Sequence, residues 1–340
     1  MFKCPSLLRL RAAIVMVLAV PLTSAISIAE SGLPVVRIAK FPGNRAAAIS
    51  YTFDDGLRDQ YTVAVPMLNE VGFKGTFFII AGRTAGTPQE GEKKQSDSKA
   101  RNRWGGISWP ELKEMADQGH EIASHTWSHP DMTKLTPGEA DAEFGKAFEM
   151  IKARIGKPPL TVAFPFNQST PEVEAIARKY HIACRTFQLG ASEKSTVASL
   201  NRWADQLIEE RKRGVLMAHA ISDGYAQFSD PEILRTHLKY VRSRGVDICV
   251  DTFANIALYE KERDESSLGV IGKSGKLICQ LTSNLDPVIY NMPLTLVIDT
   301  VDATEARAKR AGSELPVRMT KNAIEIDAVP SEHAITVEWK

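Results

Sequence analysis

Ala46–Gly56 reads AAAISYTFDDG, a β-rich run that ends in two adjacent carboxylates and a glycine. Between about residues 37 and 263, such runs alternate with amphipathic stretches, which predicts a parallel sheet with crossover helices. Seven β/α units without a glycine-rich dinucleotide motif after the first strand favour a closed or distorted barrel over a doubly wound sheet. The strands are expected at Ala46–Phe53, Gly75–Ile80, Glu121–Ser124, Leu160–Phe164, Ile182–Phe187, Gly214–His219 and Val246–Val250.

Several helix starts are marked in the sequence. Ser108–Glu111 and Thr136–Glu139 read as capping boxes, and Thr170-Pro171 and Asp230-Pro231 place a cap residue before a proline at the first helical position. The direction of these helices is therefore well defined.

A polar insertion, Thr84–Gly106, interrupts the alternation after the second strand. In a barrel such a loop lies at the face that carries the C-terminal ends of the strands, where active sites are built. For residues 88–102 a disordered surface insertion is an equal alternative. Trp104, at the end of the insertion, is expected to contact substrate, with core packing as the other explanation.

The two ends of the chain differ from the barrel. Basic residues before an apolar run, Ala12–Leu22, and small residues after it predict a secretory signal peptide over residues 1–29. The run is about half the roughly 20 residues that a membrane-spanning helix needs. We therefore expect an exported protein, periplasmic or secreted, without a permanent membrane anchor. Oligomeric state cannot be read from the sequence.

The chain of 340 residues is long enough for two domains, placed at 36–263 for the barrel and 268–340 for a small β domain. The segment from Glu265 to Gly275 reads as a linker, and sandwich strands are expected after it at Leu277–Leu281, Leu294–Thr300, Ala323–Ile326 and Ala334–Trp339.

Composition and cysteines exclude some classes of function. A net charge of +1 gives no basic surface for nucleic acid. Cys184, Cys249 and Cys279 lack zinc-site spacing, and buried unpaired thiols are favoured over a disulfide.

Five polar residues stand at the ends of the predicted strands. Asp54 and Asp55 follow the first strand, His125 and His129 follow the third, and His219 ends the sixth. Two histidines and one carboxylate form a known catalytic zinc shell, and histidines four residues apart share a face of a helical turn. Each feature alone has a plain explanation: a strand-end turn, a chance spacing or a core histidine. Their common placement at the C-terminal ends of parallel strands favours one metal site.

Three of these segments resemble motifs of the polysaccharide deacetylase family, carbohydrate esterase family four. Thr52–Gly56, His125–His129 and Met217–His219 are similar to its first, second and fifth motifs. The resemblance spans about residues 46–253 and implies a distorted (β/α)7 barrel. The small C-terminal all-β domain that the alternating runs predict lies beyond the stretch that the resemblance covers.

The resemblance implies a role for each site residue. Asp55, His125 and His129 would bind Zn²⁺ or a similar ion such as Co²⁺, Ni²⁺ or Mn²⁺, and Asp54 would be the general base. His219 would protonate the leaving group. In the Pro165-Phe166 turn, the backbone N–H near Phe166 would hold the oxyanion. Leu216 and Trp203 would form an apolar wall around the acetyl methyl group.

Two family features are missing from the sequence. The third motif begins with an arginine that orients the base, and here that position is Ala163. Arg185 and Arg58 are the cations that could substitute. The fourth motif, which tunes the acid histidine, has only a weak counterpart at Arg202–Asp205.

The leading hypothesis is hydrolysis of N-acetyl or O-acetyl groups of a polysaccharide or oligosaccharide. A hydrolase of a small non-peptide amide and a catalytically weak carbohydrate-binding protein are the alternatives. An acetylated glycan is the expected partner, and nucleic acid is not.

Overall fold

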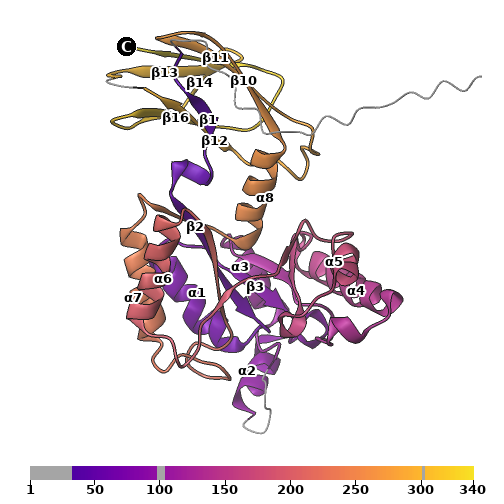
Figure 1. Ribbon diagram of the computed structural model, residues 1–340. Coiled ribbons are helices and arrows are strands. Elements are labelled where there is room, and N and C mark those ends of the chain that lie inside the picture. The colour runs from indigo at the N-terminus through magenta and orange to yellow at the C-terminus, as the bar shows by residue number, and fades with distance from the viewer. Residues whose placement is uncertain (1–32, 98–103, 301–302) are drawn as a thin grey trace, which may run out of the picture.

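The computed structural model describes residues 33–97, 104–300 and 303–340 (Figure 1). The expected signal peptide and most of the polar insertion after residue 97 lie outside these residues. None of the described helices is long and apolar enough to cross a membrane.

Parallel strands form a half-open barrel, which confirms the expected distorted barrel over the closed alternative. Their order is β6-β5-β4-β3-β2-β8-β7, and β9 pairs with the first residues of β2. β6 and β7 are the two ends of this order, so the barrel wall is open between them within the described part of the chain. The strands are β2 (Ala47–Asp54), β3 (Thr76–Ile79), β4 (Glu121–Ser124), β5 (Thr161–Ala163), β6 (Ala183–Arg185), β7 (Leu189–Gly190), β8 (Arg213–Ala218) and β9 (Ile248–Val250).

All seven predicted strands are present, and the two-residue β7 is an addition that is too short to leave a sequence pattern. Side chains alternate along each strand. On β2, Tyr51 and Phe53 belong to the apolar core under the helices, whereas Thr52 and Asp54 face the barrel interior, where Arg185 contacts both. This alternation sends the polar residues toward the site.

Helices surround the sheet (Figure 1). They are α1 (Val65–Glu70), α2 (Pro88–Ser96), α3 (Trp109–Asp117), α4 (Pro137–Ile155), α5 (Pro171–Ala177), α6 (Val197–Glu209), α7 (Glu232–Ser243) and α8 (Phe253–Asp264). The capping boxes at Ser108 and Thr136 are confirmed, and Thr170 caps α5.

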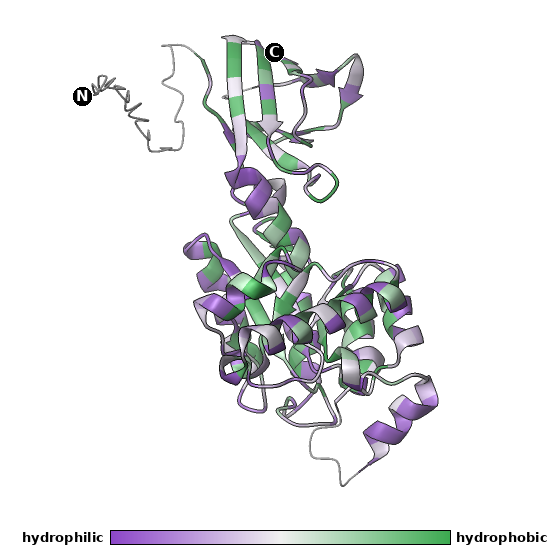
Figure 2. Cartoon of the chain, turned by 90° about the vertical axis from the view of Figure 1, so that its right-hand side faces the viewer, coloured by the Kyte–Doolittle hydropathy of each residue, from purple (hydrophilic) through white to green (hydrophobic). Residues whose placement is uncertain are grey.

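The polar insertion contains a helix. Residues 88–96 form α2, so the disordered alternative is wrong for this part. Thr87 accepts a hydrogen bond from the backbone N–H of Glu90 and Pro88 starts the helix, which explains why so polar a segment is helical. Figure 2 shows α2 as a hydrophilic helix that projects from the barrel.

Two antiparallel sheets form the second unit, with orders β1-β12-β16-β15 and β10-β11-β17-β13-β14. Their strands are β1 (Val36–Ile38), β10 (Ser266–Lys273), β11 (Lys276–Ser283), β12 (Leu294–Asp299), β13 (Ala306–Arg310), β14 (Ser313–Leu315), β15 (Val317–Met319), β16 (Ala323–Ala328) and β17 (Ile335–Trp339). Their apolar faces share one core, as in the expected sandwich.

Two assignments in this region need correction. The segment read as a linker is β10, where Leu268 and Val270 alternate with exposed residues and pack on the sandwich core. Residues 36–38 were placed with the barrel, but they form β1 and pair with β12. Three residues are too few to show which sheet they join.

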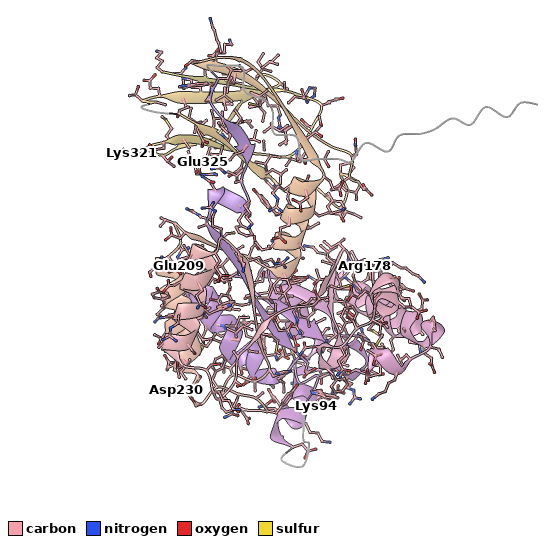
Figure 3. The ribbon with its side chains drawn as sticks, viewed as in Figure 1. Lys94, Arg178, Glu209, Asp230, Lys321 and Glu325 are labelled. Carbon is pink, nitrogen blue, oxygen red and sulfur yellow. The ribbon has the colours of Figure 1, made fainter. Side chains whose placement is uncertain are left out.

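The sandwich sits where the barrel strands begin, at the opposite end from α2 (Figure 1). Asn44, just before β2, donates a 2.9 Å hydrogen bond to Glu325 of the sandwich, which Figure 3 labels on the side facing the barrel. Helix α8 is shared: Phe253 packs inside the barrel and Tyr259 packs in the sandwich core. The two units are therefore joined by a continuous helix.

Cys184, Cys249 and Cys279 are unpaired, as expected. Burial raises the pKa of their thiols to about 11, 12 and 11, respectively. The neutral thiol is therefore the form of all three at neutral pH.

Candidate active site

Three strands deliver the expected catalytic side chains to one place. β2 ends at Asp54 and is followed by Asp55, β4 is followed by His125, and β8 is followed by His219. The Asp55 carboxylate lies 3.4 Å from Nε2 of His125, 3.5 Å from Nε2 of His129 and 3.8 Å from Nε2 of His219. The end of the barrel from which α2 projects therefore carries the site (Figure 1).

Asp55, His125 and His129 form a group that could hold a metal ion, with one ligand atom from each residue within 4.8 Å of the others. Oδ1 of Asp55 is buried and has no hydrogen-bond partner among the described residues. Burial and the neighbouring Asp54 raise the pKa of Asp55 well above its usual value, because negative charge is poorly solvated there. A bound cation would relieve this cost, so the donor set fits a divalent ion.

His125 and His129 are both neutral, which suits them to bind a metal ion. The Nδ1 atom of His125 lies 2.8 Å from the carbonyl oxygen of Ala163, so Nδ1–H donates and Nε2 keeps its lone pair. Burial lowers the pKa of His125 to about 4 and that of His129 to about 3. Both rings are therefore neutral at neutral pH, as metal binding requires.

The histidine pair lies on a loop and not on the helical turn that the spacing suggested. Thr126 and His129 both have positive φ, 66° and 64°, which an α-helix does not allow. Glu143 on α4 accepts hydrogen bonds from the backbone N–H groups of Trp127 and Ser128. A carboxylate on a neighbouring helix thus holds the loop in this conformation.

Backbone strain is concentrated at the site. Among the described residues, nine that are not glycine have positive φ, and five of them are Asp55, Thr126, His129, Phe166 and Asn167. Such conformations persist only where the surroundings hold them. Here the backbone N–H of Asp55 donates a hydrogen bond of 2.9 Å to the carbonyl oxygen of Phe78. The carbonyl oxygen of Asp55 accepts a second one, also of 2.9 Å, from the backbone N–H of Gly105.

Asp54 is held by an arginine. Nη1 and Nη2 of Arg185 lie 2.6 Å from Oδ1 and Oδ2 of Asp54. Burial would raise the pKa of Asp54, but the Arg185 charge and its hydrogen bonds outweigh burial and lower it to about 2. The other suggested cation, Arg58, instead pairs with Glu111 and Glu92.

Two residues that the sequence analysis missed connect the strand ends. Gln60 is buried, and its Nε2 donates to the carbonyl oxygens of Asp54 and His219, at 2.5 and 2.9 Å. Asp59 accepts three backbone N–H groups from residues 221–223, after His219. Asp59 and Gln60 lie three and four residues after Gly56, and their closeness in sequence to the Asp54–Gly56 turn was the available signal.

Aromatic rings surround the histidines. The Trp104 ring lies 4.5 Å from the ring of His129, and the exposed Phe166 ring lies 4.9 Å from it on another side. Tyr225, which the sequence analysis did not single out, lies 4.7 Å from the ring of His219. Trp104 thus belongs to the site, and Phe166 and the buried Pro165 lie where the turn after β5 was expected.

Leu216 and Trp203 do not belong to the site, so that prediction is wrong. Leu216 is fully buried and packs in the core under the helices, because alternation along β8 turns it away from the barrel interior. Trp203 on α6 packs against the outer side of Gly214, at the start of β8.

The remaining described histidines are structural or exposed, as expected. His120, His181 and His237 are buried with hydrogen-bond partners outside the site, and His333 is exposed. The residues suggested as a counterpart of the fourth motif, Arg202–Asp205, do not contact His219 through Asp205. Asp205 on α6 instead pairs with Tyr240 and Arg244 of the helix layer.

Comparison with known proteins supports this description. Residues 43–185 match the family model described as "Polysaccharide deacetylase". Among curated proteins, chitin deacetylase 1 of Cryptococcus neoformans var. grubii is 31% identical over 41% of this chain and 25% of its own length. A gellan lyase of Bacillus sp. is 23% identical over 88% of this chain but only 13% of its own length. The chain therefore spans a quarter or less of the length of each of these two relatives.

The fold has a solved counterpart. A structure from Mycobacterium smegmatis, named a "putative polysaccharide deacetylase", aligns over 68% of this chain and 96% of its own, with a TM-score of 0.50 and 14% identity. At this identity the likeness concerns the fold alone. It agrees with the parallel half-barrel described above.

Proposed function

We propose that the protein is a metal-dependent hydrolase that removes acetyl groups from an N-acetylated or O-acetylated glycan, because residues 43–185 match the polysaccharide deacetylase family model. One observation carries the proposal: Asp55, His125 and His129 converge as ligands directly beside the ionised Asp54. A site for glycan binding alone would not need this combination of groups.

Asp55, His125 and His129 would hold the ion, and Zn²⁺ suits two imidazoles and one carboxylate best; Co²⁺, Ni²⁺ and Mn²⁺ are the alternatives. When bound, such an ion lowers the pKa of water and polarises a carbonyl oxygen. These three residues would leave a coordination position open for water or substrate, as in catalytic zinc sites.

The protein groups around this position divide the proton transfers between them. Asp54 is ionised at neutral pH, so it is ready to accept a proton from the attacking water. His219 lies 3.8 Å from Asp55 with 23% of its side chain exposed. Burial lowers the pKa of His219, so it would first take up a proton through its exposed side and would then donate this proton to the leaving amine or alkoxide. The backbone N–H of Phe166 is the proposed donor to the developing oxyanion.

Acetate release tests the proposal. The protein would be incubated with chitooligosaccharides, peptidoglycan and acetylated xylan, with and without chelator. We expect chelator-sensitive release from at least one substrate, and loss of release by about 100-fold or more in Asp54→Asn with zinc content unchanged. Asp299→Asn, an exposed carboxylate of the sandwich, is the matched control. Glycan binding without acetate from any substrate would instead identify a binding protein.

We also propose that the protein is exported. The support is the sequence of residues 1–29, with basic residues before a short apolar run. Mass spectrometry of the protein from the periplasm or culture medium would detect a new N-terminus between residues 25 and 31. An intact N-terminus on protein that stays in the cytoplasm would contradict export.

A further inference from the structure

Arg185 is a buried cation at the C-terminal end of β6. Its side chain is 0% exposed, and that of Asp54, its ionic partner, is 4% exposed. Burying a charge is costly unless a partner and further hydrogen bonds compensate it. The two parallel contacts to Asp54, both 2.6 Å, are the geometry in which guanidinium and carboxylate bind most specifically.

Other groups fix the guanidinium itself. Nη1 also donates to Oγ1 of Thr52 at 3.0 Å, and Nη2 lies 3.4 Å from Oδ1 of Asn167. The ring of Phe78 packs beneath it, 4.9 Å from the guanidinium carbon. Arg185 is thus held from β2, β3 and the turn after β5, so it can impose one position on the Asp54 carboxylate.

The neighbouring strand leaves space for this arginine. Ala163 on β5 pairs in register with Arg185 on β6, and in-register residues of adjacent parallel strands point to the same side about 4.8 Å apart. Ala163 is fully buried in the cluster inside the barrel, together with Phe78 and Val215. Position 163 therefore offers a second starting point for a side chain directed at Asp54.

We infer that Arg185 is the positioning residue of the proposed base: it fixes the Asp54 carboxylate from β6, a task that an arginine at position 163 of β5 could perform equally. The inference rests on the proposed function. The sequence resembles a family whose motif has an arginine at the position of Ala163, whereas in this chain the arginine that contacts Asp54 comes from the neighbouring strand.

Relocation of the arginine tests this inference. The variants are Arg185→Lys, Arg185→Met and the double variant Arg185→Met/Ala163→Arg, each loaded with zinc. Arg178→Met, which removes an exposed cation on α5 (Figure 3), is the control. For each protein, kcat and KM for acetate release and the zinc content are measured, and crystal structures locate the Asp54 carboxylate.

We expect kcat to fall about 10-fold in Arg185→Lys and about 100-fold in Arg185→Met, with KM and zinc content nearly unchanged. The double variant should recover at least about 10-fold over Arg185→Met, and the control should match the wild type. If Arg185→Met does not fold, Arg185→Lys replaces it as the reference, because the buried charge is kept.

Two results would overturn the inference: kcat within about twofold of wild type in both single variants, or no recovery in a folded double variant. The crystal structures separate this inference from the proposed function. If the wild type releases no acetate, the proposed function fails, whereas an Asp54 carboxylate displaced in Arg185→Met and restored in the double variant still supports positioning. A carboxylate that stays in place in every variant contradicts positioning.

Discussion

The indole N–H of Trp104 donates a hydrogen bond of 3.3 Å to the hydroxyl of Tyr225, 121 residues further along the chain. Each ring also covers one histidine of the site, Trp104 at His129 and Tyr225 at His219. The pair therefore joins the segment after α2 to the loop after β8 directly beside the ligands.

Replacing Trp104 should affect binding more than folding. Its ring packs on His129, and its indole N–H donates to the hydroxyl of Tyr225. We expect Trp104→Ala to raise KM for a glycan by about 10-fold or more, a value typical of losing one aromatic contact. Tyr225→Phe keeps the second ring and removes only the hydrogen bond, so its KM should change by less than about threefold. Equal KM values for both variants and the wild type would exclude a substrate contact.

Removing a ligand should remove the metal. His129→Ala leaves only two protein ligands, so zinc affinity should fall by at least about 100-fold. Competition with a chromophoric chelator measures this affinity, and His333→Ala, at an exposed histidine, is the control. Acetate release by the wild type should be lost after chelation and return with Zn²⁺. The assignment is wrong if His129→Ala and the control bind zinc equally well.

Acid should destabilise the fold through His181. Burial lowers its pKa from 6.5 to about 4, and its Nε2 has no partner that could accept a proton. The unfolded chain therefore takes up a proton between pH 6.5 and pH 4 that the folded chain does not, and the free energy of unfolding falls as the pH is lowered through this range.

The variant His181→Asn can keep the hydrogen bond that Nδ1 makes to Pro159 but cannot titrate. The free energy of unfolding would be measured by urea denaturation between pH 5 and 6.5. Its slope against pH should be smaller in this variant than in the wild type by up to about 1.4 kcal/mol per pH unit. His333→Asn should keep the wild-type slope. Identical slopes for His181→Asn and wild type would show that His181 takes up its proton equally in the folded and the unfolded protein.

Leu216→Ala should reduce stability and leave catalysis intact. Leu216 is fully buried in the core under the helices, so truncation should lower the free energy of unfolding by about 2–5 kcal/mol. At a temperature where the variant stays folded, KM for the glycan should match the wild-type value. An increased KM with unchanged stability would return Leu216 to the site.

The barrel strands and the candidate metal-binding residues could be found in the sequence for the same reason. Apolar runs mark the strands, and candidate ligands such as Asp55 and His125 follow directly where these runs stop. Strand ends are local features, so one sequence is sufficient to find them.

The residues that were missed or misplaced depend on contacts between distant segments. Arg185 could be suspected but not assigned, because only the register of β5 and β6 shows that it reaches Asp54. Leu216 was misplaced because the direction of one side chain on β8 depends on which face of the strand is inside. Tyr225 leaves no pattern at all in an irregular loop.

The sandwich lies far enough from the candidate active site to serve as a point of attachment. It covers the end of the barrel where the strands begin, and Lys94 on α2 marks the opposite end (Figure 3). A surface or macromolecule that held the sandwich would therefore leave the approach to Asp55 and the histidines unobstructed. Binding through the sandwich would therefore not compete with a polymer chain at the candidate active site.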